Sequence, residues 1–307
     1  MNHVFIINPL AGPSNQVDKT KAAIAALIDI EPIVYVTKSK KDASDYVRKF
    51  CVEHPNEKTR FYACGGDGTI NEVLVGLIGQ DKTIFSMTCY PVGTGNDYVK
   101  IFGGEKKFLD LANLVSNGIE KEVDVMEINN GQTYSINVVN YGFDSNVVKV
   151  METIKRNKKT SNEKAYMKSV LESVIHYRKN EGETFVDGKK MGKGDYFCFG
   201  TIANGQYIGG QFKTAPKSIC DDGEMDCLIC EPISAFTLLS LLNKYKKGKH
   251  LDSKRLMKKY LSYCQSHGKV EIFGPDDFCI SVDGELIFGS HFEITNIQKA
   301  ITFVYPK

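Results

Sequence analysis

The chain has 307 residues, of which 42% are hydrophobic, and a formal net charge of +2. This length and apolar content favour two domains with sizeable cores, and the near-neutral charge argues against nucleic acid as a partner. No apolar run is long enough to cross a membrane, and no charged segment precedes the first apolar run, so we expect a cytoplasmic protein without a signal peptide.

Nine cysteines are scattered along the chain, and several stand in apolar runs, as Cys64 and Cys89 do. Such positions predict buried, reduced thiols, which are typical of a cytosolic protein. Cys227 and Cys230 form a Cys-x-x-Cys spacing, but no second pair stands at a zinc-binding distance from them. We therefore do not expect a zinc site.

Predicted strands and helices alternate through the first part of the chain. Strands are expected at 3–8, 33–36, 61–64 and 84–90, and helices at 14–28, 40–52 and 69–78. This alternation is typical of a doubly wound parallel sheet. We expect an α/β domain over residues 1–128, which the last strands of the chain rejoin from about residue 290 to 307.

A glycine-rich turn, Gly65-Gly66-Asp67-Gly68-Thr69, follows the third predicted strand. Glycines allow backbone N–H groups to approach a ligand closely, and a helix that begins at Thr69 would direct its positive end toward the turn. Phosphate is the natural ligand of such a turn. Asp67 would repel a phosphate unless a cation or a hydroxyl lies between them, which indicates metal–nucleotide chemistry. The alternative is a tight turn without a ligand.

A second glycine turn, Gly93-Thr94-Gly95-Asn96-Asp97, follows the fourth predicted strand and repeats this design. Two such turns on parallel strands of one sheet open at its carboxyl edge, where ligands bind in open α/β sheets.

The two turns together resemble the catalytic domain of the diacylglycerol kinase and sphingosine kinase superfamily, and soluble bacterial lipid kinases match the chain in length. The resemblance implies an α/β + β fold with an N-terminal doubly wound α/β domain of the NAD kinase/phosphofructokinase type. It also implies a C-terminal antiparallel β-sandwich-like domain and an active site in the cleft between the two domains. The implied reaction is ATP- and Mg²⁺-dependent phosphorylation of a lipid hydroxyl, with diacylglycerol as the leading substrate and phosphatidic acid as its product.

The resemblance also assigns nucleotide-binding residues by position. They are Asn8, Pro9, Gly12, Thr37, Gly65, Gly66, Asp67, Gly68, Thr69, Asn71, Glu72, Gly93, Thr94, Gly95 and Asn96. Members of the family often carry a Lys or Arg just after the glycine of the first loop, but Pro13 follows Gly12 here. The sequence therefore does not identify which cation, if any, neutralises the phosphates from this loop. For Thr37, a helix cap is the alternative role.

The second part of the chain changes to the period-two alternation of antiparallel strands. Hairpins are expected at 122–138 and 183–192, a half-buried strand at 195–203, and a helical segment at 151–180. Further strands are expected at 270–273, 278–282 and 286–288, followed by a last pair of strands that ends at Tyr305. We expect a β-rich acceptor domain over residues 129–289.

Five acids are the candidate catalytic residues. Asp67, Asp97 and Asp124 would hold Mg²⁺ directly or through water, and Asp124 matches the acid that opens the family's second region. Asp283 and Glu285 lie in a Val-Asp-Gly-Glu motif that resembles the family's catalytic hairpin. On a hairpin both side chains can approach the acceptor hydroxyl, so either can be the base; we favour Glu285 as the base and Asp283 as the residue that orients it.

The loop at 214–226 contains Asp-Gly-x-x-Asp and resembles a magnesium-binding loop of the family. By position, the ligands would be the Asp222 carboxylate and the carbonyl groups of Ile219 and Glu224, with water completing the octahedron. An Asp-Gly turn between strands is the alternative.

The helical stretch at 233–260 is apolar in its first half and rich in Lys and Arg in its second half, where Asp252 is the one acid from 244 to 259. Such clusters are attracted to anionic phospholipid headgroups. We therefore expect a protein that is peripheral to the inner membrane leaflet; a solvated helix face is the alternative, and a homodimer is left open.

Other functions remain open at this stage. The acceptor could be another lipid, such as a sphingoid base, a monoacylglycerol or another glycerolipid, or a soluble molecule such as NAD. A nucleotide sensor without enzymatic activity is a further alternative, although all five acids are present.

Overall fold

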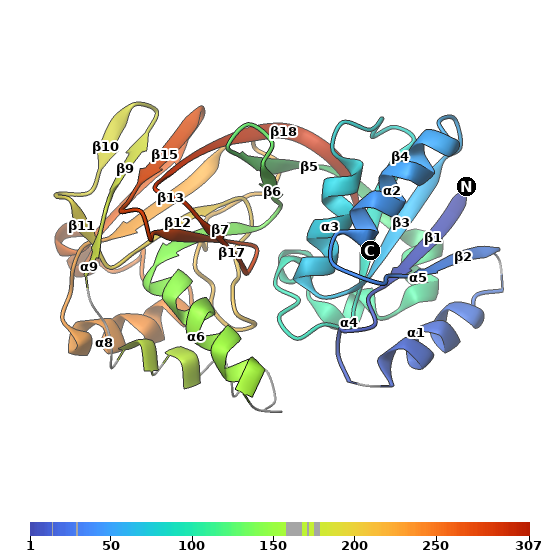
Figure 1. Cartoon of the computed structure of the whole chain (residues 1–307), viewed down its shortest axis with the longest axis horizontal. Coiled ribbons are helices and arrows are strands. Elements are labelled where there is room, and N and C mark those ends of the chain that lie inside the picture. Colours follow the sequence, from blue (N-terminus) through green and yellow to red (C-terminus); the bar gives the residue numbers. More distant parts are fainter. Residues whose placement is uncertain (14, 29, 158–167, 171, 175–178) are drawn as a thin grey trace. The chain divides into compact units, whose positions relative to one another are not determined.

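The computed structural model describes every residue except 14, 29, 158–167, 171 and 175–178 (Figure 1). The chain divides into two compact units. Unit 1 comprises Met1–Val125 and Gln298–Lys307, and unit 2 comprises Met126–Ile297. The chain passes from one unit to the other within the long strands β5 (Ile119–Ile128) and β18 (His291–Tyr305).

Unit 1 alternates strands and helices. Its elements are β1 (Asn2–Ile7), α1 (Gln16–Ala25), β2 (Pro32–Val36), α2 (Asp42–Glu53), β3 (Thr59–Gly65), α3 (Asp67–Leu77), β4 (Phe85–Pro91), the 3-10 helix η1 (Tyr98–Phe102), α4 (Glu105–Phe108) and α5 (Leu111–Asn117). The strands β1, β3 and β4 are almost completely buried, which is typical of a parallel sheet covered on both faces.

The sheet of unit 1 has the strand order β2-β1-β3-β4, and the end of β18 pairs with β4 at Thr302 and Phe303. All these pairs are parallel. The connection after β1 leads outward to β2, whereas the connection after β3 leads the other way to β4. The carboxyl ends of β1 and β3 therefore form a topological switch point, the place at which open α/β sheets bind ligands.

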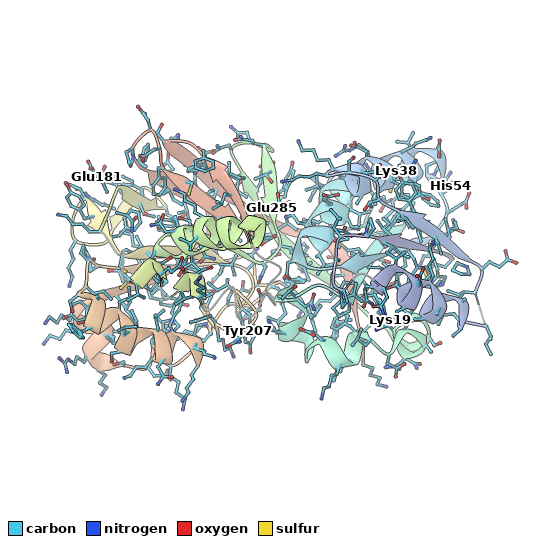
Figure 2. The ribbon with its side chains drawn as sticks, turned by 60° about the horizontal axis from the view of Figure 1, so that its bottom comes forward. Lys19, Lys38, His54, Glu181, Tyr207 and Glu285 are labelled. Carbon is cyan, nitrogen blue, oxygen red and sulfur yellow. The ribbon has the colours of Figure 1, made fainter. Side chains whose placement is uncertain are left out.

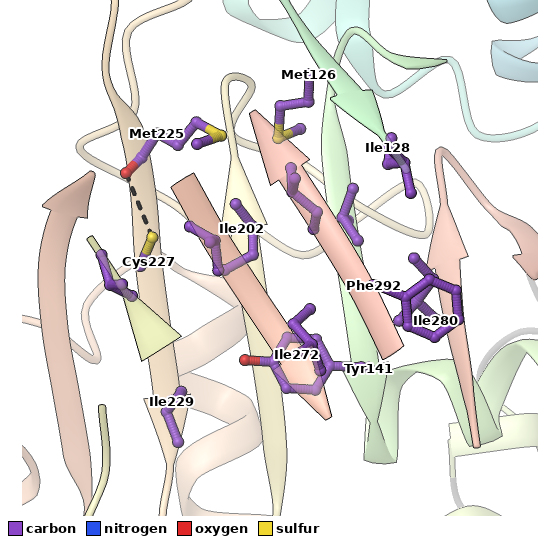
Figure 3. Packing of buried hydrophobic residues seen from close by; sticks show 14 of the residues in the cluster. Met126, Ile128, Tyr141, Ile202, Met225, Cys227, Ile229, Ile272, Ile280 and Phe292 are labelled. Carbon is purple, nitrogen blue, oxygen red and sulfur yellow. Dashed lines mark hydrogen bonds between the residues drawn. The ribbon is translucent and has the colours of Figure 1, made fainter. Parts of the chain in front are cut away.

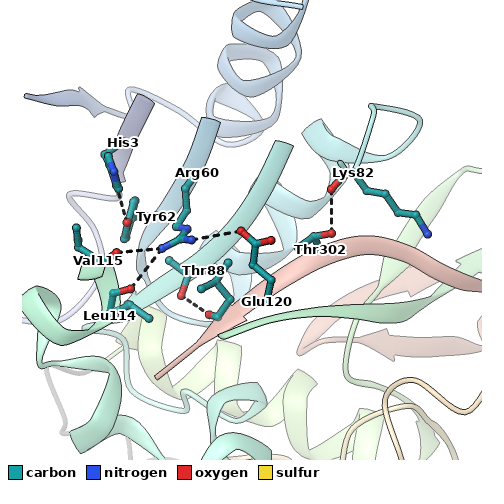
Figure 4. Close-up of polar contacts among 10 residues, drawn as sticks. His3, Arg60, Tyr62, Lys82, Thr88, Leu114, Val115, Glu120 and Thr302 are labelled. Carbon is teal, nitrogen blue, oxygen red and sulfur yellow. Dashed lines mark hydrogen bonds and ion pairs between the residues drawn. The ribbon is translucent and has the colours of Figure 1, made fainter. Parts of the chain in front are cut away.

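A buried arginine joins the helical and strand layers of unit 1 (Figure 4). The Nη1 of Arg60 on β3 lies 3.4 Å from the carbonyl oxygens of Leu114 and Val115, and its Nη2 lies 3.4 Å from the Glu120 carboxylate. The guanidinium thus satisfies carbonyl groups at the C-terminal end of α5, which have no partner within the helix.

Unit 2 contains mainly antiparallel strands. Its elements are β6 (Thr133–Ser135), β7 (Val138–Gly142), α6 (Phe143–Asn157), β8 (Asn180–Glu181), β9 (Glu183–Val186), β10 (Lys189–Met191), β11 (Tyr196–Phe197), β12 (Phe199–Ala203), β13 (Met225–Cys230), α8 (Ala235–Lys246), α9 (Lys254–Lys259), β14 (Leu261–Ser266), β15 (Lys269–Phe273), β16 (Cys279–Val282) and β17 (Glu285–Phe288). A six-stranded sheet has the order β14-β13-β12-β7-β16-β17, and β10, β9 and β15 continue antiparallel to β18.

One apolar core joins the strands of the two sheets (Figure 3). Tyr141 and Ile280 enter it from the six-stranded sheet, and Ile272 and Phe292 enter it from the other sheet. The opposite face of the six-stranded sheet packs against α6 and α8 in a second cluster. Unit 2 is therefore a β-sandwich with one face covered by helices.

The alternation of side chains along β13 separates the two cysteines of the Cys-x-x-Cys spacing. Cys227 belongs to the core between the sheets, whereas Cys230 belongs to the cluster under α8. Residues three apart on a strand point to opposite faces, so the two sulfur atoms cannot share one metal ion. All nine cysteines are free thiols.

Several expected elements differ in their bounds. Helix α3 begins at Asp67 instead of Thr69, because the Gly66 carbonyl already accepts from the amides of Thr69 and Ile70. The expected last pair of strands is one strand, β18, and the stretch at 233–260 forms two helices instead of one. The strand expected at 195–203 is divided between β11 and β12.

Within the described part of the chain, no helix has both the length and the apolar character needed to cross a membrane. Part of the helical segment expected at 151–180 lies outside the described residues.

Candidate active site

The first loop of the site follows β1 and is tied to α3. The Asn8 side chain donates from Nδ2 to the Thr69 hydroxyl at 3.0 Å and accepts at Oδ1 from the Leu10 amide at 2.9 Å. A Cβ on Gly65 would lie 2.1 Å from the same Thr69 hydroxyl, so only glycine fits there. The bond between Asn8 and Thr69 therefore crosses the switch point between β1 and β3.

The two glycine turns contact each other through their backbones. A Cβ on Gly93 would lie 2.3 Å from the Gly66 Cα, and the amides of Val92 and Gly93 both donate to the Gly65 carbonyl. Gly12 of the first loop has a φ of +74°, and a Cβ on it would lie 2.5 Å from the Val92 carbonyl oxygen. The three loops predicted to hold the phosphates thus form one continuous surface within unit 1.

Two carboxylates flank the second glycine turn. Asp67 Oδ1 accepts from the backbone amides of Asp97 and Tyr98 at 2.7 and 3.3 Å. A Cβ on Gly95 would lie 2.8 Å from Asp67 Oδ2 and 3.2 Å from Asp97 Oδ2, so this glycine lies between the two acids. Burial and then the charge of Asp97 raise the pKa of Asp67 to about 7, against the lowering effect of the amides and Lys100. A cation near Asp67 would favour its ionised form.

Lys100 is a candidate site residue that the sequence reasoning missed. Its Nζ donates to the Asp97 carboxylate and, at 2.8 Å, to the Gly95 carbonyl oxygen. The lysine therefore places a positive charge beside the two acids, in a chain whose first loop lacks the family's usual basic residue. Its position three residues after Asp97, in a helical turn, was the available signal.

Other predicted nucleotide-binding residues lie around these loops. Pro9, Gly12 and Thr94 are exposed, Gly68 and Asn71 are half-buried in α3, and Asn96 is buried with a φ of +44°. Thr37 is buried, and its hydroxyl lies 3.4 Å from the Ile7 carbonyl oxygen. Glu72 accepts from the amides of Lys41 and Ala43, so both its oxygens hold the start of α2. That contact gives Glu72 a structural role in addition to the one we predicted.

Asp124 is completely buried on β5. Its Oδ1 accepts from the backbone amide of Lys299 at 2.7 Å, at a point where Lys299 has a φ of +49°. The carboxylate therefore stabilises an irregular point in β18. Sequence reasoning had placed it with Asp67 and Asp97 as a magnesium ligand.

Asp283 and Glu285 lie on the β16–β17 hairpin of unit 2 and have different surroundings. Asp283, with a φ of +47°, accepts from four donors in 135–138: the Ser135 hydroxyl at 2.6 Å and the amides of Ile136, Asn137 and Val138 at 3.0 to 3.2 Å. Glu285 is exposed at the first position of β17 (Figure 2). The geometry gives Asp283 the role of fixing the hairpin and leaves Glu285 accessible.

The predicted magnesium loop ends at an acid, Asp226, that was not among the predicted ligands. Asp222 accepts from the Glu224 amide at 3.0 Å, and Ile219 is 52% exposed. Asp226 follows on β13; Tyr263 donates to its Oδ1, while its buried Oδ2 has no hydrogen-bond partner. Burial, with a contribution from Asp222, raises the pKa of Asp226. An unpaired oxygen beside a second acid fits a cation site, although the described residues contain no cluster of three ligating His, Cys, Asp or Glu side chains.

Two protein-family models together match most of the chain. Residues 2–128 match the diacylglycerol kinase catalytic domain, and residues 137–290 match the YegS C-terminal NAD kinase beta sandwich-like domain. These matches confirm the predicted α/β + β fold.

Similar proteins support the same assignment. A "Diacylglycerol kinase" of Bacillus subtilis (strain 168) is 29% identical over 248 residues, which is 80% of this chain and 77% of that protein. A protein named "Probable lipid kinase YegS-like" from Enterobacter sp. (strain 638) is 28% identical over 306 residues, 97% of this chain and 94% of that protein. The crystal structure of a diacylglycerol kinase from Bacillus anthracis str. Sterne has a TM-score of 0.67 at 20% identity, and the match covers 99% of this chain and 96% of that one.

These matches favour a lipid kinase over the alternatives of a soluble-acceptor kinase and a nucleotide sensor. The three glycine loops lie within the match to the diacylglycerol kinase catalytic domain, and the two acids of the β16–β17 hairpin lie within the match to the YegS C-terminal domain. The chain belongs to the lipid kinase family that combines a diacylglycerol kinase catalytic domain with a YegS-type C-terminal domain, and is thus a phosphotransferase that acts on an alcohol acceptor.

Proposed function

We propose that this protein transfers the γ-phosphate of ATP to the free hydroxyl group of diacylglycerol, in a Mg²⁺-dependent reaction that forms phosphatidic acid and ADP. The observation that carries the proposal is the joined surface of three glycine loops at the switch point of unit 1, with Asp67 and Asp97 beside it. The choice of diacylglycerol rests on the name of the Bacillus subtilis relative.

The ATP phosphates would lie on the loops that contain Asn8, Gly66 and Gly93. Backbone amides at the start of α3 supply donors there, and glycines at the loop contacts keep side chains away. Lys100 would balance the negative charge of the two acids and the phosphates, since it already lies against Asp97.

Two groups of residues fit magnesium. Asp67 and Asp97 would hold the Mg²⁺ that accompanies ATP, and this ion would supply charge neutralisation for the transferred phosphoryl group. Asp222, with the carbonyl groups of Ile219 and Glu224, would hold a second, structural Mg²⁺. Asp226 follows this loop, and its unpaired buried oxygen supports a cation there.

Glu285 would act as the general base. As the acceptor oxygen forms its bond to the γ-phosphorus, the bond from that phosphorus to the bridging oxygen of ADP breaks, and the proton of the hydroxyl passes to the Glu285 carboxylate. Asp283 would fix the position of Glu285, because its own carboxylate is occupied by donors from 135–138.

The test is transfer of phosphate from labelled ATP, with and without Mg²⁺, to a panel of acceptors in mixed micelles. The panel contains diacylglycerol, monoacylglycerol, a sphingoid base and NAD. We expect labelled phosphatidic acid with diacylglycerol, and only when Mg²⁺ is present. Labelling of another acceptor at a higher kcat/KM would overturn the choice of substrate.

Two variants with the same change of charge test the base. Glu285→Gln should lower kcat by about 10²- to 10⁴-fold, the usual effect of losing a general base. Glu181→Gln is the matched control, because Glu181 is also an exposed acid on a strand of unit 2 (Figure 2). Equal activity of the two variants would remove Glu285 from the mechanism.

A further inference from the structure

Four cationic side chains surround one pocket of unit 2. The pocket has a volume of about 330 Å³ and is lined by Lys193, Arg255, Lys258 and Lys259. Arg255, Lys258 and Lys259 belong to α9, and Lys193 belongs to the loop between β10 and β11. Segments about sixty residues apart in the sequence thus bring four positive charges together.

These charges are only weakly compensated. Among the described residues, no ion pair joins any of the four side chains to a carboxylate within 4.0 Å. One buried acid, Glu231, contacts the backbone beside the pocket: its Oε1 accepts from the Lys193 backbone amide at 2.9 Å, and its own amide donates to the Tyr260 carbonyl oxygen. A positive excess therefore remains even after Glu231 is counted.

Internal contacts hold the pocket in shape. Lys193 Nζ lies 3.5 and 3.4 Å from the carbonyl oxygens of Lys258 and Lys259, at the end of α9. Lys259 Nζ lies 5.0 Å from the centre of the Tyr260 ring, a cation–π contact. On the inner side of α9, Leu256 and Met257 pack against the cluster under α8. The cations are thus presented from a fixed frame, which lowers the entropy cost of binding an anion.

The neighbouring helix α8 exposes apolar side chains. Phe236 is 87% exposed and Leu239 is 46% exposed, whereas Leu238 and Leu241 of the same helix are buried in the cluster that α9 also contacts. Cationic side chains beside exposed aromatic and aliphatic residues are typical of surfaces that bind the interface of a membrane. A soluble phosphate would not cover Phe236, but a bilayer would.

We propose that the pocket of Lys193, Arg255, Lys258 and Lys259 binds the phosphate group of an anionic phospholipid and docks unit 2 on a membrane that contains such lipids. The Arg255 guanidinium can hold two phosphate oxygens at once, and the three ammonium groups add charge. Phe236 adds apolar contact with the bilayer. This site differs from the loops and the hairpin described above, and its occupancy requires neither ATP nor an acceptor.

The test is co-sedimentation of the whole protein, without ATP, with vesicles of phosphatidylcholine alone or mixed with phosphatidylglycerol. We expect binding to the mixed vesicles only, and a decrease as salt rises. Arg255→Gln/Lys258→Gln should weaken binding by about 25-fold, at about fivefold for each cation removed. Lys247→Gln/Lys249→Gln removes the same charge from the same segment but outside the pocket, and should retain most of the binding.

The variant Arg255→Lys distinguishes binding in a preformed phosphate pocket from binding by a diffuse positive field. The charge is retained, but the planar fork that matches phosphate is lost, so a pocket predicts about a two- to fivefold loss and a diffuse field predicts none. Circular dichroism and phosphorylation of a micellar substrate without anionic lipid serve as fold controls. All variants should match the wild type in both measurements.

Three results would overturn the proposal. The first is an equal loss of vesicle binding in Arg255→Gln/Lys258→Gln and in Lys247→Gln/Lys249→Gln, which would indicate a diffuse positive field. The second is binding of the pocket variant as tight as that of the wild type. The third is release of the protein by inorganic phosphate at the same total concentration as the lipid phosphate, which indicates a site for small anions. None of these results depends on kinase activity, so the proposed reaction is tested separately.

Discussion

Replacing Asp283 by Asn tests the division of roles on the β16–β17 hairpin. The carboxylate accepts from one hydroxyl and three amides: Oδ1 serves Ser135, Asn137 and Val138, and Oδ2 serves Ile136. An Asn side chain can retain the first three contacts, but its NH₂ group would then face the Ile136 N–H, donor against donor. A hydrogen bond to a charged group contributes about 1.5–3 kcal/mol. With the weakening of the other three, we expect a loss of about 2–4 kcal/mol.

The assay is thermal unfolding followed by calorimetry, which can resolve separate transitions of the two units. For a unit of this size, the expected loss lowers the midpoint of the unit 2 transition by about 5–15 °C. Glu285→Gln, an exposed substitution, should change stability by less than about 0.5 kcal/mol while it removes most of the activity. The reasoning fails if Asp283→Asn unfolds at the wild-type midpoint and loses as much kcat as Glu285→Gln, because Asp283 would then be the base.

Two further predictions concern unit 1. Since the pKa of Asp67 is raised to about 7 in the folded protein, the folded carboxyl keeps its proton between pH 4 and 7 while the unfolded one loses it, so the wild type loses stability over this range. Without Mg²⁺, Asp67→Asn should therefore become more stable relative to the wild type as pH rises from 5 to 8, by about 2.5 kcal/mol, and a pH-independent difference in unfolding midpoint would contradict this. Gly93→Ala should lower the free energy of unfolding by about 1–3 kcal/mol and weaken ATP binding, because its Cβ would clash with the Gly66 backbone. The control is Gly194→Ala, which has open space around the new Cβ and should change neither the unfolding midpoint nor the ATP titration. Equal behaviour of the two variants would contradict this prediction.

Much of unit 1 could be predicted from local sequence patterns. The strands β1, β3 and β4 are short apolar runs, each of which leads into a loop rich in glycine, proline or asparagine, and their parallel pairing follows from the intervening helices. The contact between the two glycine turns could not be predicted, because it depends on the distance between neighbouring strands. The start of α3 at Asp67 was also missed, since local signals define helix ends only to within a few residues.

The roles of the acids were harder to predict, because they depend on contacts between distant parts of the chain. Asp283 is bonded to residues 145 to 148 positions earlier, so the sequence alone could not separate its role from that of Glu285. Lys100 lies only three residues from Asp97, but the two side chains pair because η1 is helical, and this pairing was not predicted from the sequence. Asp226 ends the Asp-Gly-x-x-Asp motif but is not among the predicted ligands, because its unpaired oxygen becomes apparent only in the folded chain.

The close fit between the glycine turns explains why the pair of motifs is more specific than either motif alone. A strand, a glycine turn and a helix can form a phosphate site in many folds. Here the second turn fits against the first, since any side chain on Gly93 would occupy the position of the Gly66 backbone. The same fit brings Asp97 beside Asp67, and the proximity of the two carboxylates contributes to the raised pKa of Asp67. The two motifs are therefore one structural unit, in which the glycines determine the distance between the acids and the acids create the demand for a cation.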